Sequence, residues 1–138
     1  MQDNLIIIGI NAPKEHQAVI TRLIHGLADL YLKDVTPLFP YPETMIDEGQ
    51  TSPAPDILLY DHSTERTMVI IEVTHTAGSK KDCIKVQNLM NDYDVPEGFV
   101  YDYKKSVWYK ISAKSQEPIC ESFSTILNAD LSKFLVKT

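Results

Sequence analysis

The sequence predicts an α/β (α+β) fold in which a mixed β-sheet is flanked by helices. Three observations lead to this class: apolar, β-branched runs of strand length recur along the chain, two stretches repeat apolar residues at helical spacing, and turn residues separate these segments. With 138 residues, 43% of them hydrophobic, the chain is long enough for one domain with a substantial core and too short for two. We therefore expect residues 1–138 to form a single domain.

The first two predicted elements are a strand and a helix. Residues 4–10 (NLIIIGI) are an apolar run of strand length, and Pro13 suits the first turn of a helix within residues 11–33. His16 falls on the apolar face of this helix, which favours a histidine packed in the core. The other residues of that face recur at helical spacing and are Ile20, Leu23, Leu27 and Tyr31.

The middle of the chain predicts a loop and then a hairpin. Residues 36–54 contain four prolines, which favour a loop with at most a short edge hairpin around 44–47. Residues 57–61 and 67–73 are apolar runs joined by a five-residue polar turn, so we expect antiparallel neighbours. The second run is apolar at consecutive positions, which predicts burial on both faces and a central place in the sheet.

A second helix follows the hairpin. Ser79 and Asp82 form a capping signature for a helix over residues 80–93. The residues of its predicted apolar face are Cys83, Val86, Met90 and Tyr93. This helix is expected to cover the sheet.

The last third of the chain predicts three strands and a short helix. Residues 98–103 and 106–112 read as strands joined by a turn at Lys104 and Lys105, in which Tyr101, Trp108 and Tyr109 build the core and its rim. Residues 121–135 predict a final strand and a short helix that Asp130 caps. The sequence contains no repeat and no low-complexity segment.

Composition excludes several kinds of protein. The formal charge of −6 argues against a chain coated with positive charge, although the lysines of residues 80–114 allow a local contact with a polyanion. Cys83 and Cys120 lack the spacing of zinc ligands, so we expect two buried thiols. No apolar run reaches the roughly 20 residues that span a membrane, and the N-terminus lacks a secretory signal, so we expect a cytoplasmic protein with no membrane contact. Phosphate-loop, dinucleotide-binding and serine-hydrolase motifs are missing.

Two carboxylates stand at the ends of the predicted hairpin strands. Asp56 precedes the first strand and Glu72 lies near the end of the second, and antiparallel pairing brings these ends together. Two carboxylates and a backbone carbonyl, for which Val73 is the candidate, suit Mg²⁺ or Mn²⁺. Lys85, one helix away, is positioned to stabilise charge on a phosphate. Alternatively, Pro55-Asp56 is an ordinary turn, Glu72 reaches solvent at a strand end, and Lys85 is a solvated helix residue.

These residues carry a resemblance to a known family. Pro55-Asp56, an apolar strand and Glu72-Val73-Thr74 resemble the PD-(D/E)xK signature of the restriction-endonuclease-like superfamily, with Thr74 in place of the usual lysine. Over most of its length the chain resembles the Uma-type restriction endonucleases, a bacterial group within that superfamily. The segments that carry this longer resemblance are IIEVTHTAGSKKDCIK, DVPEGFVYDYKKSVWYKI and, more loosely, SFSTILNADLSKFL.

The resemblance implies a site as well as a fold. It implies a restriction-endonuclease-like core with Asp56 and Glu72 as ligands of Mg or Mn and Lys85 as the transition-state lysine that replaces the one missing at Thr74. Asp82 matches the acidic position before this lysine, whereas Asp94 stands where the family has glycine. In such folds the first helix often adds an acidic residue to the site, for which Glu15 is the candidate.

A second group of polar residues is considered for substrate binding. His75, Lys80, Lys81 and Gln87 follow the second strand of the hairpin and could contact a nucleic-acid backbone. For His75 an exposed loop histidine without a role is the alternative, and for Gln87 a polar surface residue is the preferred interpretation.

Two functions from different classes follow from these residues. The first is a Mg²⁺- or Mn²⁺-dependent endonuclease that hydrolyses DNA phosphodiester bonds. The second is a catalytically inactive relative that keeps the nuclease fold as a partner-binding or assembly module, which the missing strand lysine and the acidic charge favour. The short chain with exposed strand edges also predicts a homodimer, which would place two sites on one duplex.

Overall fold

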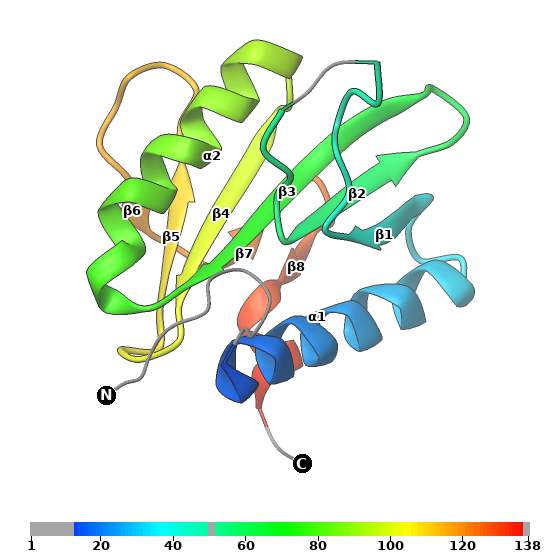
Figure 1. Ribbon diagram of the computed structural model, residues 1–138. Coiled ribbons are helices and arrows are strands. Elements are labelled where there is room, and N and C mark those ends of the chain that lie inside the picture. Colours follow the sequence, from blue (N-terminus) through cyan, green and yellow to red (C-terminus); the bar gives the residue numbers. More distant parts are fainter. Residues whose placement is uncertain (1–12, 50–51, 137–138) are drawn as a thin grey trace.

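The computed structural model describes residues 13–49 and 52–136, and the strand predicted at 4–10 lies outside these residues. A mixed sheet of six strands forms the centre, with α1 (Lys14–Leu32) on one face and α2 (Ser79–Tyr93) on the other (Figure 1). Neighbouring strands follow the chain order, and they are β1 (Leu38–Pro42), β2 (Ile57–Asp61), β3 (Arg66–Thr74), β4 (Glu97–Asp102), β5 (Val107–Ile111) and β6 (Ile119–Cys120). This arrangement confirms the predicted fold class.

The pairing of the strands follows from their connections. A tight turn joins β2 to β3, and these strands pair antiparallel as the sequence predicts. The connection from β3 to β4 contains the short 3₁₀ helix η1 (Thr76–Gly78) and α2, so these two strands are parallel. The predicted turn at Lys104 and Lys105 is confirmed, because the Asp102 carboxylate accepts hydrogen bonds from both of their amides, at 3.0 and 3.1 Å.

Each helix buries one apolar face against the sheet. Under α1 the core contains Leu23 and Leu27 together with Phe99, all at most 1% exposed. Under α2 a second core contains Val86 and Met90. At Gly98 the approach of α2 to β4 is so close that an added Cβ would lie 2.6 Å from side-chain atoms of both of these residues. The sheet is therefore buried on both sides, which explains why β3 is apolar at consecutive positions.

The C-terminal segment closes the α1 side. It contains a two-stranded pair, β7 (Phe123–Ser124) with β8 (Ala129–Asp130), and the 3₁₀ helix η2 (Leu131–Leu135). Asp130 caps this helix as predicted, since its carboxylate accepts a hydrogen bond from the Ser132 amide at 3.0 Å. The ring of Phe134 packs directly against Gly26 of α1.

Three predictions about local structure are wrong. The segment 36–54 is not all loop, because Leu38–Pro42 forms β1 at the edge of the sheet; two prolines fit there, since the outer side of an edge strand needs no N–H donors. Cys120 is exposed rather than buried, because β6 is a two-residue edge strand, whereas Cys83 is half-buried. Ser79 does not cap α2; its hydroxyl donates to the Thr76 carbonyl at 3.0 Å instead.

Among the described residues, no helix combines the length and the apolar character needed to cross a membrane.

Candidate active site at the open end of the β2–β3 hairpin

The candidate site lies where β2 and β3 stop pairing. Beyond Ile57 the backbones separate, and two carboxylates take over the hydrogen bonding. Glu72 Oε1 accepts from the Asp56 amide at 2.9 Å, and Asp56 Oδ2 accepts from the Val73 amide at 2.8 Å. Each carboxylate thus binds backbone of the opposite strand, and the structure brings Asp56 and Glu72 together at this end of the sheet.

Glu72 is a buried carboxylate near a second negative group. Its side chain is 8% exposed, in a strand whose neighbouring residues are apolar. Burial, and after it the charge of Asp56, raise the pKa of Glu72 from its ordinary value of 4.5 to about 7, although Lys85 opposes this shift. Carboxylates with perturbed pKa values cluster at functional sites. The raised pKa of Glu72 therefore supports the choice of this cluster as the candidate site.

Lys85 supplies a positive charge from α2. It lies on the second turn of the helix, and its Nζ donates to Glu72 Oε2 at 2.7 Å. The Lys85 side chain is 27% exposed, so its ammonium group contacts both the buried carboxylate and the solvent. The structure therefore places Lys85 beside the carboxylates, although Thr74 holds the strand position of the usual lysine and is itself buried.

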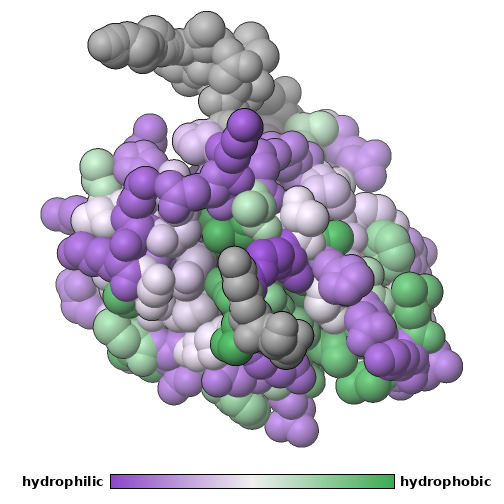
Figure 2. Space-filling view, turned by 90° about the horizontal axis from the view of Figure 1, so that it is seen from below, coloured by the Kyte–Doolittle hydropathy of each residue, from purple (hydrophilic) through white to green (hydrophobic). Residues whose placement is uncertain are grey.

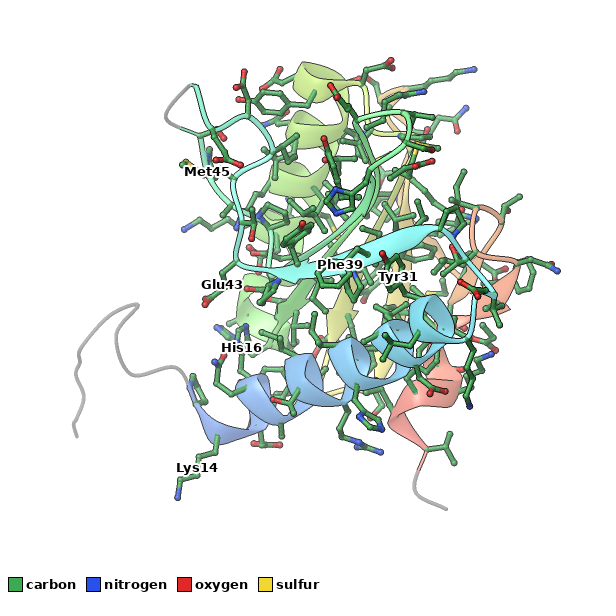
Figure 3. All side chains as sticks on the ribbon, turned by 90° about the vertical axis from the view of Figure 1, so that its right-hand side faces the viewer. Lys14, His16, Tyr31, Phe39, Glu43 and Met45 are labelled. Atoms are coloured by element: carbon green, nitrogen blue, oxygen red, sulfur yellow. The ribbon has the colours of Figure 1, made fainter. Side chains whose placement is uncertain are left out.

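A histidine of α1 completes the cluster. The prediction that His16 packs in the core is wrong: its Nε2 lies 2.9 Å from the Val73 carbonyl oxygen and 3.4 Å from Asp56 Oδ2, and its side chain is 19% exposed. Figure 3 shows His16 on the first turn of α1, beside the sheet, whereas Lys14 points away from it. The helical pattern located the correct face of α1, but the first turn extends beyond the buried core to the strand ends.

The position of His16 next to a carboxylate changes its charge. The hydrogen bond to Asp56 is the largest of several effects that together raise the pKa of His16 from 6.5 to about 9, against the opposing effect of burial. At neutral pH the imidazole is therefore protonated. His16 and Lys85 flank the two carboxyl groups from opposite faces of the sheet, so each carboxyl group has a basic neighbour.

The other candidate residues lie around this cluster. Glu15 is exposed and pairs with Lys104 Nζ at 2.8 Å, whereas its neighbour His16 contacts Asp56. His75, Lys80 and Lys81 are exposed after β3, whereas Gln87 is half-buried and donates to the Ser112 carbonyl at 2.7 Å. Gln87 therefore ties α2 to the segment after β5.

The donor set suits a hard or borderline divalent cation. Two carboxylates and the Val73 carbonyl provide the oxygen ligands that Mg²⁺ and Mn²⁺ take in proteins. Within residues 13–49 and 52–136, no three side chains of the His, Cys, Asp and Glu types form a group that could hold a metal by themselves. A cation at this site would therefore need the backbone carbonyl and water in addition to side chains.

Comparisons with known proteins were made by sequence and by structure. No protein-family model matches the sequence, and no curated protein matches it. In fold, the chain is similar to the crystal structure of "a putative nuclease belonging to DUF820" from Anabaena variabilis, with a TM-score of 0.68 and 13% identity over 91% of this chain and 84% of that one. It is also similar to the type IIG restriction endonuclease BpuSI, with a TM-score of 0.56 and 12% identity over 84% of this chain but 14% of that one.

At these identities the similarity shows the fold alone. Both solved structures match a sheet and helix arrangement that extends over most of this chain. The fold that the sequence resemblance implied is thereby confirmed, whereas membership of the Uma-type group stays a prediction. The chain has a restriction-endonuclease-like fold.

Proposed function

We propose that the protein is a metal-dependent endonuclease that hydrolyses phosphodiester bonds of DNA. The observation that carries this proposal is the pairing of Asp56 with Glu72 at the open end of the hairpin, with the Val73 carbonyl beside them and Lys85 at 2.7 Å from Glu72. A structural ion pair needs only one carboxylate for one lysine. Two carboxylates held together by backbone amides form a preorganised site for a cation.

Each residue has a distinct role in this proposal. Asp56, Glu72 and the Val73 carbonyl hold Mg²⁺ or Mn²⁺, which, when bound, polarises the phosphodiester and supplies a nucleophilic water. Lys85 stabilises the charge that develops on the phosphate, and its partial exposure lets the ammonium group reach a bound strand. The backbone hydrogen bonds of both carboxylates keep their oxygens in place.

Positive charges near the site support binding of a nucleic-acid backbone. The first turns of α1 and α2 and the turn after β4 lie at the same end of the molecule as the C-terminal end of β3 (Figure 1). Hydrophilic side chains make up much of the face seen from this end (Figure 2). Lysines stand in all three segments, although the whole chain is acidic: Lys14, Lys80, Lys81, Lys104 and Lys105. Such a local concentration attracts phosphates.

A second candidate function is a catalytically inactive nuclease fold that binds a partner protein. The observation that favours it is that Asp56 and Glu72 each already have a basic partner, His16 and Lys85, without a cation. In that case Asp56→Ala would leave partner binding unchanged. The homodimer predicted from the sequence applies to either function.

Cleavage assays decide between the two functions. Supercoiled plasmid and single-stranded DNA are incubated with Mg²⁺ or Mn²⁺ and with wild-type protein, Asp56→Ala or Glu72→Ala, purified identically. The matched control is Asp92→Ala, an exposed acidic residue at the far end of α2. We expect cleavage by the wild type and by Asp92→Ala that disappears in both site variants while their circular dichroism is unchanged. Equal cleavage by all four proteins, or by none, would refute the endonuclease.

A further inference from the structure

We infer that a cleft beside β1 and β2 binds an arginine side chain of a partner protein, presented on a basic segment. This aromatic cleft has no residue in common with the carboxylate cluster, so the inference does not depend on the proposed nuclease. The residues that define it are Tyr41 and Tyr60 of the sheet, His62 of the turn after β2, and Ile46, Asp47 and Glu48 of the connection between β1 and β2.

The cleft exists because α2 covers only part of its side of the sheet. This helix packs against β3, β4 and β5. Tyr41 and Tyr60 lie on the same side, at the margin of the core under α2. Over β1 and β2 the connection between these strands takes the place of a helix, and Figure 3 shows its Met45 across β1 from α1. The space between sheet and connection is about 530 Å³, within the range of roughly 300–1,000 Å³ that ligand pockets occupy.

The three rings of the aromatic cleft contact one another at steep angles. The centroid of the Tyr60 ring lies 4.9 Å from that of His62 and 6.3 Å from that of Tyr41, with interplanar angles of 79° and 76°. The Tyr41 hydroxyl and His62 Nε2 form a hydrogen bond of 3.0 Å, which holds these two rings together. In an edge-to-face contact, the ring that supplies its edge keeps its own faces free. The cleft therefore presents aromatic faces in more than one direction.

The segment that builds the cleft concentrates the negative charge of the chain. Residues 34–65 contain seven acidic residues and no Lys or Arg, whereas the rest of the chain has twelve acidic and thirteen basic residues. The next basic residue, Arg66, donates to the Asp94 carbonyl at 3.0 Å and is not among the described residues that line the cleft. The acidic residues of the segment are Asp34, Glu43, Asp47, Glu48, Asp56, Asp61 and Glu65.

Aromatic faces and carboxylates together select a cation. The quadrupole of an aromatic ring attracts a cation above its face, and a carboxylate adds a direct charge interaction. A guanidinium group stacks flat on aromatic rings and donates several hydrogen bonds to oxygen acceptors, so arginine fits this lining better than lysine does. The same carboxylates repel phosphate groups, which distinguishes the aromatic cleft from the lysines near the candidate active site.

The source of the arginine is a second protein. Residues 1–12 contain no Lys or Arg, so this part of the chain cannot supply the guanidinium group. The edge strand β1 contains Pro40 and Pro42, which lack the N–H donors that an added strand would need, so the partner inserts a side chain and does not extend the sheet. Tyrosine and arginine are enriched among the residues that contribute most to protein interfaces, in agreement with such a contact.

Fluorescence anisotropy with labelled probes tests the inference. The probes are fluorescein-labelled pentaarginine and pentalysine and, as the alternative ligand, a labelled decathymidylate strand. The cleft variants are Tyr41→Leu, which removes the ring, Tyr41→Phe, which keeps the ring without its hydroxyl, and Glu48→Gln. The matched controls are Tyr103→Leu, a half-buried tyrosine after β4, and Glu117→Gln, an exposed glutamate beyond β5. Circular dichroism verifies the fold of each variant, and sedimentation equilibrium measures self-association.

We expect the wild type to bind pentaarginine saturably and pentalysine more weakly. Tyr41→Leu should weaken the binding of pentaarginine at least about threefold, which is within the range of one cation–π contact. Glu48→Gln should weaken it about twofold or more, because one charge is lost. Tyr41→Phe and both controls should match the wild type, since they keep the ring and the charges of the cleft.

Three results would overturn the inference and leave the proposed nuclease unaffected. The first is that the wild type fails to bind pentaarginine, or that Tyr41→Leu binds it as the wild type does. The second is that Tyr41→Leu loses affinity for decathymidylate and keeps it for pentaarginine, which would assign the cleft to nucleobases. The third is that Tyr41→Leu abolishes self-association of a wild type that binds no peptide, which would assign the cleft to a second copy of this chain.

Discussion

Removing Lys85 should destabilise the protein in a manner that depends on pH. Lys85 Nζ lies 2.7 Å from Glu72 Oε2, and the Glu72 side chain is only 8% exposed. In Lys85→Ala this carboxylate loses the cation that opposes the effects of burial and of Asp56, so the pKa of Glu72 should rise further above 7. The variant must then either bury an unpaired charge or bind a proton.

The size and the sign of the change in unfolding free energy with pH follow from proton binding by the folded state. A pKa raised from 4.5 to about 7 means that the folded protein binds this proton more tightly than the unfolded chain does. The group therefore lowers stability as pH rises from about 4.5 through 7, by about 3 kcal/mol at about 1.4 kcal/mol per pKa unit. Breaking a buried pair costs about 3–5 kcal/mol, and the partial exposure of Lys85 favours the lower end.

Urea unfolding at about pH 5 and about pH 8 measures this effect. At the higher pH we expect Lys85→Ala to lose about 3 kcal/mol of unfolding free energy, and at the lower pH, where Glu72 is protonated when folded, below about 1 kcal/mol. Lys81→Ala, an exposed lysine of the same helix, is the control. In a Glu72→Gln background the loss should be small at both pH values. Equal losses of the single variant at both pH values would refute the assignment of Lys85 as the counter-charge of Glu72.

Three further predictions concern the backbone, the core and the sheet edge. Asp94 ends α2 with a φ of 54°, a left-handed conformation that costs non-glycine residues about 1–2 kcal/mol, so Asp94→Gly should raise the unfolding free energy by about 1 kcal/mol; an unchanged urea midpoint would contradict this. Gly98→Ala should lower the thermal midpoint by an amount equivalent to about 1–3 kcal/mol, because Val86 and Met90 leave no room for a Cβ, and wild-type stability would show that α2 can move away. Ile119 is 58% exposed on edge strand β6, so Ile119→Lys should convert the predicted homodimer to a monomer in sedimentation equilibrium. A wild-type protein that is itself monomeric would contradict this prediction.

Elements with a strong local pattern could be predicted from the sequence. The hairpin of β2 and β3 shows two apolar runs and a polar turn within twenty residues or so, and α2 shows one apolar face, so both follow from neighbouring residues alone. The proximity of Asp56 and Glu72 follows from that hairpin, because antiparallel pairing fixes which strand ends meet.

Features that depend on distant segments could not be predicted. β1 contains two prolines, which break a central strand, and only its place at the sheet edge makes them acceptable. His16 lies at the helical spacing of the apolar residues of α1, so the local pattern assigns it to the core. Its contact with Val73 depends on how far the helix extends along the sheet, which no local pattern encodes. Cys120 reads as an apolar residue, but it lies on the outermost strand.

The contacts of the candidate site close loops of different lengths, and these lengths predict the order in which the contacts form during folding. Those of Glu72 with Asp56 and Lys85 span 16 and 13 residues, whereas the contact of His16 with Val73 spans 57. Because loop-closure entropy grows with the logarithm of loop length, closing the long loop costs about 1 kcal/mol more than closing the shortest. The segment from Asp56 to Lys85 can therefore assemble its charged cluster early, and α1 docks onto it afterwards. In pulsed hydrogen exchange, the amide of Val73 should gain protection before those of α1.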